Sequence, residues 1–76
     1  MRETVEMIVK ALVDDADAVD VREVERGGAT RIEIRVAEDD MGKLIGRQGR
    51  TIRALRSVAH AVGVKRHQRI TLEVLE

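Results

Sequence analysis

Apolar residues spaced three and four positions apart predict a helix at the start of the chain. They are Val5, Ile8, Val9 and Leu12, which share one face of a helix. We therefore expect an amphipathic helix over residues 3–14, with Thr4 as a candidate N-cap. The acidic run 14–17 would place negative charge at the negative end of the helix dipole, so the helix should end there.

Alternation of apolar and polar residues predicts two regular β-strands, each with one buried and one solvated face. The first covers residues 30–37, and its apolar positions are Ile32, Ile34 and Val36. The second closes the chain, and its apolar positions are Ile70, Leu72 and Val74. The basic segment 64–68 precedes this last strand as a connection.

A less regular strand is predicted over residues 19–26. Val24 is out of phase with Val19 and Val21, a pattern typical of a β-bulge. The glycine pair 27–28 separates this segment from the next strand, which favours a two-residue hairpin turn.

Two further helices are predicted in the second half of the chain. A short one covers residues 40–45, with acidic residues at its N-terminal end, as the helix dipole favours. A longer one covers residues 50–62, with Gly63 as its candidate C-cap. Its core stripe consists of Ile52, Leu55, Ala59 and Val62. Ala54, Val58 and Ala61 widen that stripe, so either the first helix or another molecule must cover this extra edge.

The element order α-β-β-α-α-β predicts an α+β fold, a three-stranded sheet with helices packed on one face. We expect the 76 residues to form a single domain, residues 1–76, with a small core. The chain has no Cys, Pro or aromatic residue. Disulfides and thiolate metal sites are therefore excluded, and the core must be aliphatic. The pattern leaves open where the last strand joins the sheet.

The formal net charge of zero conceals a segregation of charge along the chain. Residues 1–40 contain six Lys and Arg and twelve Asp and Glu, whereas residues 41–72 contain eight Lys and Arg and no acid. Such segregation indicates a basic face for a polyanion and an acidic face directed elsewhere. Chance clustering on a charge-rich surface is the alternative, but the basic block coincides with a glycine loop.

That loop, between the two later helices, has the properties of a phosphate-binding site. Gly46 and Gly49 allow a tight turn and the close approach of another backbone. The helix that follows directs unpaired N–H groups and the positive end of its dipole at the loop, which favours phosphate. Arg47 and Arg50 add formal charge at the same place. We expect this loop to grip a phosphate backbone.

The loop and its flanks resemble the KH domain, an RNA-binding module. Residues 45–52, Ile-Gly-Arg-Gln-Gly-Arg-Thr-Ile, fit the family pattern I-G-x-x-G-x-x-I, whose loop clamps about four nucleotides of backbone. The element order matches the bacterial, type II arrangement. The run 41–50, followed by Ala54-Leu55-Arg56, is similar to the small single-KH proteins of the KhpA type. The resemblance covers essentially the whole chain.

The resemblance implies a groove with two lips that holds short single-stranded RNA. Candidate residues on the first lip, the glycine loop and its helices, are Lys43, Ile45, Gly46, Arg47, Gln48, Gly49 and Arg50. Candidates on the second lip, the last strand and the loop before it, are Lys65, Arg66, His67 and Arg69. Bases would lie over Ile45 and its aliphatic neighbours. The absence of aromatic residues argues against the base stacking of RRM-type or OB-type domains.

No pattern in the sequence indicates catalysis, a metal site or a cofactor. The chain lacks a Cys nucleophile, an H-E-x-x-H motif and the Gly-Lys-Ser/Thr ending of a Walker loop. We interpret the acid pairs 14–15 and 39–40 as helix-end residues, and His60 as a solvated helix residue. No apolar segment could span a bilayer, and polar residues follow Met1 where a signal peptide would be apolar. We expect a soluble, cytoplasmic protein that is not an enzyme.

Two functions of different classes remain open. The first is a non-catalytic RNA-binding protein, acting as an RNA chaperone or post-transcriptional regulator. The second is a protein assembly module with incidental RNA affinity. The resemblance encourages it, because KhpA-type proteins are associated with dimerisation and with a larger KH-containing partner. Ala54, Val58 and Ala61 on the long helix are the candidate dimer interface, because small residues would let a second helix approach closely.

Overall fold

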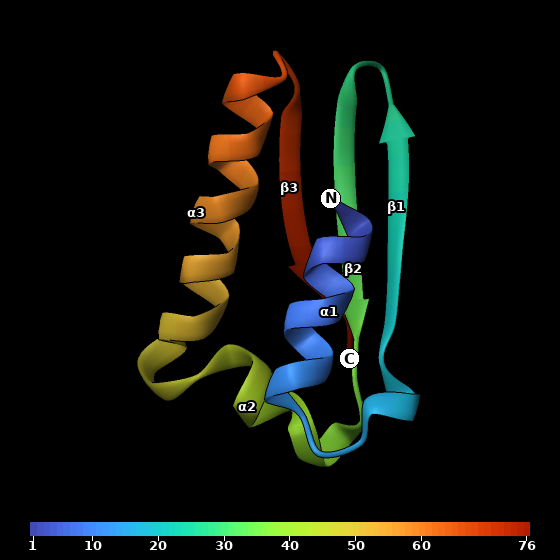
Figure 1. The fold of residues 1–76 in the computed structure, drawn as a ribbon, viewed down its shortest axis with the longest axis vertical. Coiled ribbons are helices and arrows are strands. Elements are labelled where there is room, and N and C mark those ends of the chain that lie inside the picture. Colours follow the sequence, from blue (N-terminus) through green and yellow to red (C-terminus); the bar gives the residue numbers. More distant parts are fainter.

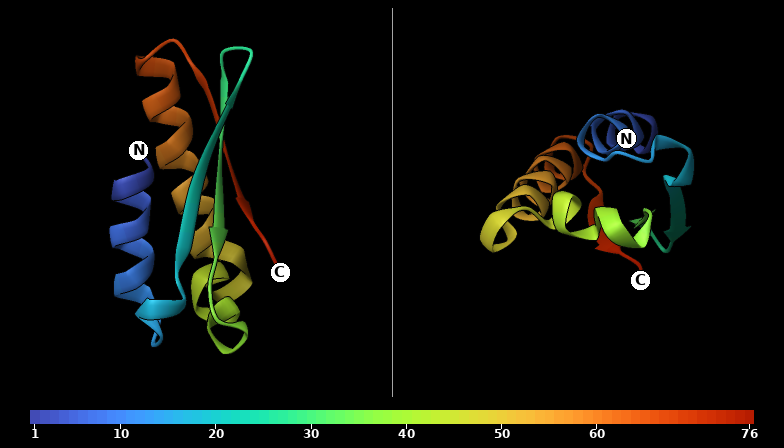
Figure 2. Two further views of the ribbon diagram at one scale, coloured as in Figure 1. Left: turned by 90° about the vertical axis from the view of Figure 1, so that its right-hand side faces the viewer. Right: turned by 90° about the horizontal axis from the view of Figure 1, so that it is seen from below.

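The predicted architecture is confirmed in a computed structural model that describes residues 1–76. Its helices and strands are α1 (Arg2–Leu12), β1 (Asp20–Arg26), β2 (Ala29–Arg35), α2 (Met41–Ile45), α3 (Arg50–Lys65) and β3 (Arg69–Val74). Single turns of 3₁₀ helix lie at Ala16–Ala18, Glu38–Asp40 and Arg47–Gly49. The helices lie on one face of the sheet and leave the other face open (Figures 1 and 2). None of the helices is both long and apolar enough to cross a membrane.

The sheet has the strand order β1-β2-β3, which answers the question that the sequence left open. β1 and β2 are antiparallel, whereas β3 lies parallel to β2 and forms the second edge of the sheet. The hairpin between β1 and β2 is the expected two-residue turn, because Arg26 pairs with Ala29. Gly27 and Gly28 both have positive φ, at 59° and 81°, a conformation that favours glycine.

The predicted bulge in β1 is wrong. The antiparallel pairs run without interruption from Asp20 with Arg35 to Arg26 with Ala29. Val24 pairs with Arg31, and both lie on the open face of the sheet. The valine is out of phase because it lies on the opposite face from Val21, and the register of the strand is regular.

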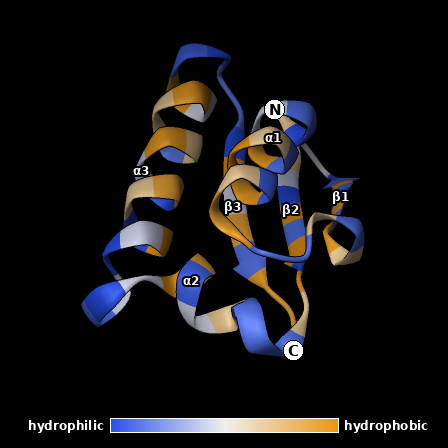
Figure 3. Cartoon of the chain, turned by 60° about the horizontal axis from the view of Figure 1, so that its bottom comes forward, coloured by the Kyte–Doolittle hydropathy of each residue, from blue (hydrophilic) through white to orange (hydrophobic).

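The core is aliphatic and lies between the helices and one face of the sheet. Its buried residues are Val5, Val9, Val13, Val21, Ile32, Ile34, Val36, Leu44, Ile52, Leu55, Ala59, Ile70 and Leu72. The alternation along β2 is visible in Figure 3, where hydrophobic and hydrophilic segments follow one another. α1 packs on β1, whereas α3 packs on β3.

α1 begins earlier than predicted, and Thr4 does not cap it. Met1 occupies the N-cap position, and its carbonyl oxygen accepts a hydrogen bond of 3.0 Å from the backbone N–H of Val5. Thr4 therefore lies within the first turn of the helix, and its side chain is exposed. The helix ends at Leu12, just before the acidic run.

The prediction that Gly63 ends the long helix is also wrong, because α3 continues to Lys65. Gly63 is buried inside the helix, where a Cβ atom would lie 2.6 Å from the carbonyl oxygen of Gln68. Glycine is therefore needed for the close packing of α3 on the chain that enters β3. His67, with a left-handed φ of 55°, follows the C-cap residue Arg66 and turns the chain.

The extra apolar edge of α3 is left uncovered. Ala54, Val58 and Ala61 are all exposed, and the exposed fraction of Val58 is 47%. α1 lies over the β1 side of the sheet and does not cover this edge. The first of the two alternatives, coverage by the N-terminal helix, is therefore wrong.

Candidate nucleic-acid interface

The glycine loop has an unusual backbone conformation. Gly46, Gln48 and Gly49 all have positive φ, at 79°, 56° and 75°. The loop is closed by a hydrogen bond of 3.1 Å from the N–H of Gly49 to the carbonyl oxygen of Gly46. Gln48 and Gly49 are consecutive left-handed residues, with ψ at 26° and 15°, and together they turn the chain into the first residue of α3.

The two glycines of this loop have different structural roles. A Cβ atom at Gly46 would lie 2.7 Å from the Cβ and 2.8 Å from the backbone nitrogen of Thr51, in the first turn of α3. A Cβ atom at Gly49 would have Nε of Arg53 as its nearest neighbour, at an ordinary distance of 3.9 Å. Gly46 is therefore required by packing and by backbone conformation, and Gly49 by backbone conformation alone.

Arg53 holds the loop in place, a role that the sequence analysis missed. Its Nη2 donates a hydrogen bond of 2.7 Å to the carbonyl oxygen of Gln48, and its Nε donates one of 3.3 Å to that of Gly49. The guanidinium group thereby offsets the partial negative charge of these two carbonyl oxygens. It also adds a third arginine side chain to the loop region. The spacing of four residues between Gly49 and Arg53 was the available signal, since it equals one helical turn.

The cations of the first lip fall into two groups. Arg47 and Arg50 are exposed and form no ion pair, and the exposed Gln48 lies between them. Lys43 instead points its Nζ at the carboxylate of Asp14, and Asp40 lies 4.0 Å away. The hydrogen bond to Asp14 raises the pKa of Lys43. The charge of Lys43 is therefore largely compensated by acidic residues and is directed away from the loop.

Asp40 joins the start of α2 to the segment after α1. Its buried carboxylate accepts hydrogen bonds of 3.0 Å from the backbone N–H of Asp15 and 3.3 Å from that of Asp14. These hydrogen bonds, together with the charge of Lys43, hold the pKa of Asp40 below its usual value despite partial desolvation. Both acid pairs therefore lie near helix ends, as expected, and Asp40 additionally fixes α2 beneath the loop.

An apolar groove of about 660 Å³ opens beside the glycine loop. Ile45, which precedes the loop and is 38% exposed, forms part of its wall. The rest of the lining was not identified from the sequence. It consists of Val36, Met41 and Leu75, with Arg35, Glu38 and Glu76 as its polar members. These residues come from the ends of two strands and from α2, so only the fold brings them together.

The charged residues named for the two predicted lips lie at opposite ends of α3. The glycine loop precedes the first residue of this helix, whereas Lys65 is its last residue, and Arg66, His67 and Arg69 follow. A helix of 16 residues is about 24 Å long. Figure 1 shows the loop beside α2 at one end of the molecule and the connection to β3 at the other. The basic residues of the two lips thus form one cluster at each end of α3, and a hollow between α3 and β3 lies between these ends.

The chain is similar to known proteins over essentially its whole length. The family model described as KhpA/KhpB, KH domain, matches residues 2–74. RNA-binding protein KhpA of Halalkalibacterium halodurans is 47% identical over 76 residues, which cover the whole of both chains. RNA-binding protein KhpA of Aquifex aeolicus is 45% identical over 76 residues, which cover all of this chain and 96% of that one.

A solved structure shares the fold. The chain described as "Crystal structure of APE1850" aligns with a TM-score of 0.58 and 30% sequence identity. The alignment covers 91% of this chain and 49% of that one, so the present chain spans about half of its length. Together with the full-length family match, the glycine loop and the α-β-β-α-α-β order show that the chain belongs to the KhpA/KhpB family of KH domains.

Proposed function

We propose that this protein binds short single-stranded RNA without catalysing a reaction, as an RNA chaperone or post-transcriptional regulator. The observation that carries the proposal is the glycine loop. It places the exposed Arg47, Gln48 and Arg50 at the N-terminus of a 16-residue helix, next to an apolar groove. The relatives that match over all or nearly all of their length are named RNA-binding proteins, which supports the same conclusion.

The loop provides donors for phosphate groups. The dipole of the 16-residue helix favours negative charge beside its first turn, although the N–H of Arg50 itself donates to the carbonyl oxygen of Arg47. Arg53 occupies the carbonyl oxygens of Gln48 and Gly49, which would otherwise repel phosphate. The phosphates of a bound strand would therefore meet the positive end of the helix dipole and the side chains of Arg47 and Arg50.

The groove accounts for a preference for unpaired bases. Its aliphatic walls, including Ile45 and Leu75, can contact base faces only when the bases are not stacked within a duplex. Arg35, Glu38 and Glu76 supply hydrogen-bonding groups for base edges. Duplex RNA presents its phosphates but conceals these faces, so it should bind more weakly.

Competition between single-stranded and duplex RNA tests this proposal. Fluorescence anisotropy would follow a labelled short single strand, displaced either by the unlabelled strand or by the same strand annealed to its complement. We expect the single strand to compete and the duplex to compete much more weakly. Equal competition by the two RNAs would contradict the proposal that the groove binds unpaired bases. Binding would then be explained by the electrostatic attraction between basic side chains and phosphates alone.

A second function is favoured by the uncovered edge of α3. We infer that a second copy of this chain, or a larger KH-containing protein, packs on Ala54, Val58 and Ala61. All three are exposed along one side of the helix, and Val64 at its end is 64% exposed. Small side chains let two helices approach closely, and the same stripe on two copies is self-complementary about a two-fold axis. Assembly through this edge leaves the glycine loop free for RNA.

A further inference from the structure

β1 forms an edge of the sheet that no other element covers. The strand order places it outside β2, and Figure 1 shows no helix or strand beyond it. Its seven residues pair with β2 in an uninterrupted register, without a bulge or a proline. Bulges and prolines are two common devices that keep a further strand from pairing with an edge. The backbone of β1 is therefore open to the addition of another strand.

The register identifies the backbone groups on the outer side of β1. The carbonyl oxygen of Ile34 accepts a hydrogen bond of 2.9 Å from the N–H of Leu75, so Ile34 directs its backbone groups at β3. Its partner in β1, Val21, therefore points its own N–H and C=O away from the sheet. This direction alternates along an antiparallel strand, so Glu23 and Glu25 do the same. No loop, helix end or side chain supplies a partner for these three residues.

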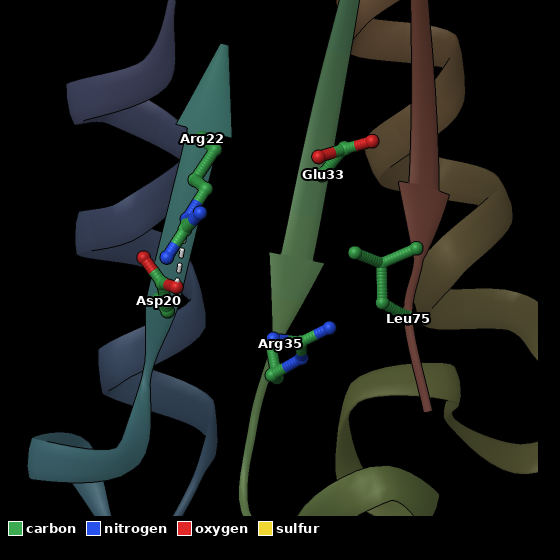
Figure 4. A pocket seen from close by; sticks show the side chains of 5 residues that line it. All are labelled: Asp20, Arg22, Glu33, Arg35 and Leu75. Carbon is green, nitrogen blue, oxygen red and sulfur yellow. Dashed lines mark hydrogen bonds and ion pairs between the residues drawn. The ribbon is translucent and has the colours of Figure 1, made fainter.

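The two glutamates leave uncompensated negative charge on one face of this edge. Side chains alternate along a strand, so Glu23 and Glu25 lie on the same face as the buried Val21. Both are exposed and form no ion pair, and they are about 7 Å apart along the strand. On the opposite, open face, Asp20 is instead paired with Arg22 at 3.0 Å (Figure 4). Because the two carboxylates repel each other, a cation beside them is favoured.

We propose that the outer edge of β1 binds an extended, basic segment of another protein as a fourth strand of the sheet. In antiparallel pairing, the more stable kind, the residues directly opposite Glu23 and Glu25 lie on the same face as these glutamates. Lys or Arg at these alternate positions of the segment neutralises both carboxylates. The position between them lies opposite Val24, which is half-buried on the open face, so it suits an apolar residue. The segment therefore has the pattern basic-apolar-basic.

This partner can bind while RNA occupies the glycine loop. β1 and β3 are the two opposite edges of the sheet, and α3, which begins at the glycine loop, packs on β3. RNA itself is a poor occupant of the outer edge, because its phosphates would meet the carboxylates of Glu23 and Glu25. The charge of this edge thus selects a basic protein segment over a nucleic acid.

A synthetic peptide, Lys-Val-Lys-Val-Lys with blocked ends, tests the inference in the absence of RNA. The readout is amide hydrogen exchange of the protein, measured by NMR. In the free protein, the N–H groups of Val21, Glu23 and Glu25 should exchange rapidly, whereas those of Arg22 and Val24, which face β2, should be protected. With the peptide at about ten times its dissociation constant, exchange at the three outer N–H groups should slow about tenfold.

Methylation of the peptide backbone separates strand pairing from attraction between charges. The N–H of the central lysine faces β1 in the antiparallel arrangement, so its N-methylation should weaken binding at least about tenfold. The N–H of a valine faces away from β1, so N-methylation there is the matched control and should leave binding nearly unchanged. Equal binding of the two methylated peptides would overturn the inference, as would an unmodified peptide that does not bind.

Charge reversal tests the chemistry of the partner. Glu23→Lys with Glu25→Lys should lose the basic peptide and instead bind Glu-Val-Glu-Val-Glu. The control, Glu3→Lys with Asp39→Lys, makes the same change of charge at other exposed positions and should behave as the parent does. A reversed variant that binds the basic peptide as tightly as the parent would contradict the proposal. Protection of the outer N–H groups in the free protein would also overturn it, by showing that a second copy already covers the edge.

Discussion

Gly46 packs directly against Thr51, so the beginning of the glycine loop and the first turn of α3 form one rigid unit. A Cβ atom at Gly46 would lie 2.8 Å from the backbone nitrogen of Thr51, a distance that real Cβ atoms do not reach. Gly46 also has a φ of 79° with a ψ of 171°, a combination that is almost restricted to glycine. The conformation of the loop is thus built into the backbone and its packing on α3.

Alanine substitution should separate the two loop glycines. Gly49→Ala adds only the cost of a left-handed residue, about 1–2 kcal/mol. Gly46→Ala should destabilise the fold by more than this, because it also forces Thr51 and the start of α3 to move. Urea unfolding followed by circular dichroism measures both. Equal losses of unfolding free energy would contradict the packing role of Gly46.

Asp40 should make stability depend on acidic pH. Its folded-state pKa lies below the unfolded value of 3.8, because the backbone N–H of Asp15, and then that of Asp14, donate to the carboxylate. The ionised form therefore stabilises the fold above pH 3.8, and this contribution is lost as the pH falls through the folded-state pKa.

The variant Asp40→Asn tests this pH dependence. It should be less stable than the parent at neutral pH and should lose less stability on acidification. The measurement is the urea midpoint as a function of pH. Parallel curves for the parent and the variant would show that these hydrogen bonds do not contribute to the pH dependence.

Binding of short RNA should weaken steeply with salt. If three to five phosphates are neutralised, the logarithm of the binding constant should fall against the logarithm of salt concentration with a slope of about −2 to −3.5. Arg50→Gln should make this slope shallower by about 0.7, the share of one phosphate. Titrations at several salt concentrations give the slope. A value near zero would favour assembly as the principal function.

The exposed edge of α3 should mediate self-association. Ala61→Asp places a carboxylate at the margin of this edge, where it disturbs the monomer core least, and should yield a monomer. Ala11→Asp makes the same exchange at an exposed position of α1 and serves as the control. Light scattering after size exclusion measures the mass of each protein. A monomeric parent at high micromolar concentration, or full dimerisation of Ala61→Asp, would contradict the assignment.

Periodicity predicted the elements that present one face to the core. β2 and β3 alternate strictly, and the apolar stripes of α1 and α3 follow the helical period, so their existence and type could be derived from the sequence. The boundaries depended on contacts between distant residues. Gly63 resembled a C-cap until its contact with Gln68 placed it within α3, because sequence alone does not show which chain packs against a glycine.

The candidate site was only partly predictable, because several of its residues are brought together by contacts between distant parts of the chain. The glycines and Arg47 lie within one local motif, so they could be identified from their spacing. Arg53 and the groove residue Leu75 were missed because their roles depend on where a helix start and a strand end meet. Lys43 was included for its charge, but the ion pair with Asp14 comes from a residue 29 positions away.

The central claim is that the glycine loop holds the RNA backbone, and a double substitution tests it most directly. Arg47→Asp with Gln48→Asp places two carboxylates where phosphates would lie. Both residues are exposed, and Asp tolerates the left-handed φ of Gln48, so the fold should survive. The control Thr4→Asp with Lys10→Asp makes the same change of charge at exposed positions of α1.

Affinity for a short single-stranded RNA, measured by fluorescence anisotropy at one salt concentration, gives the answer. We expect the loop variant to bind at least about tenfold more weakly than the parent, since each charge-assisted hydrogen bond contributes about 1.5–3 kcal/mol. The control should bind nearly as the parent does, and both variants should keep the parent's circular dichroism spectrum. A folded loop variant that binds RNA as tightly as the parent would contradict the account.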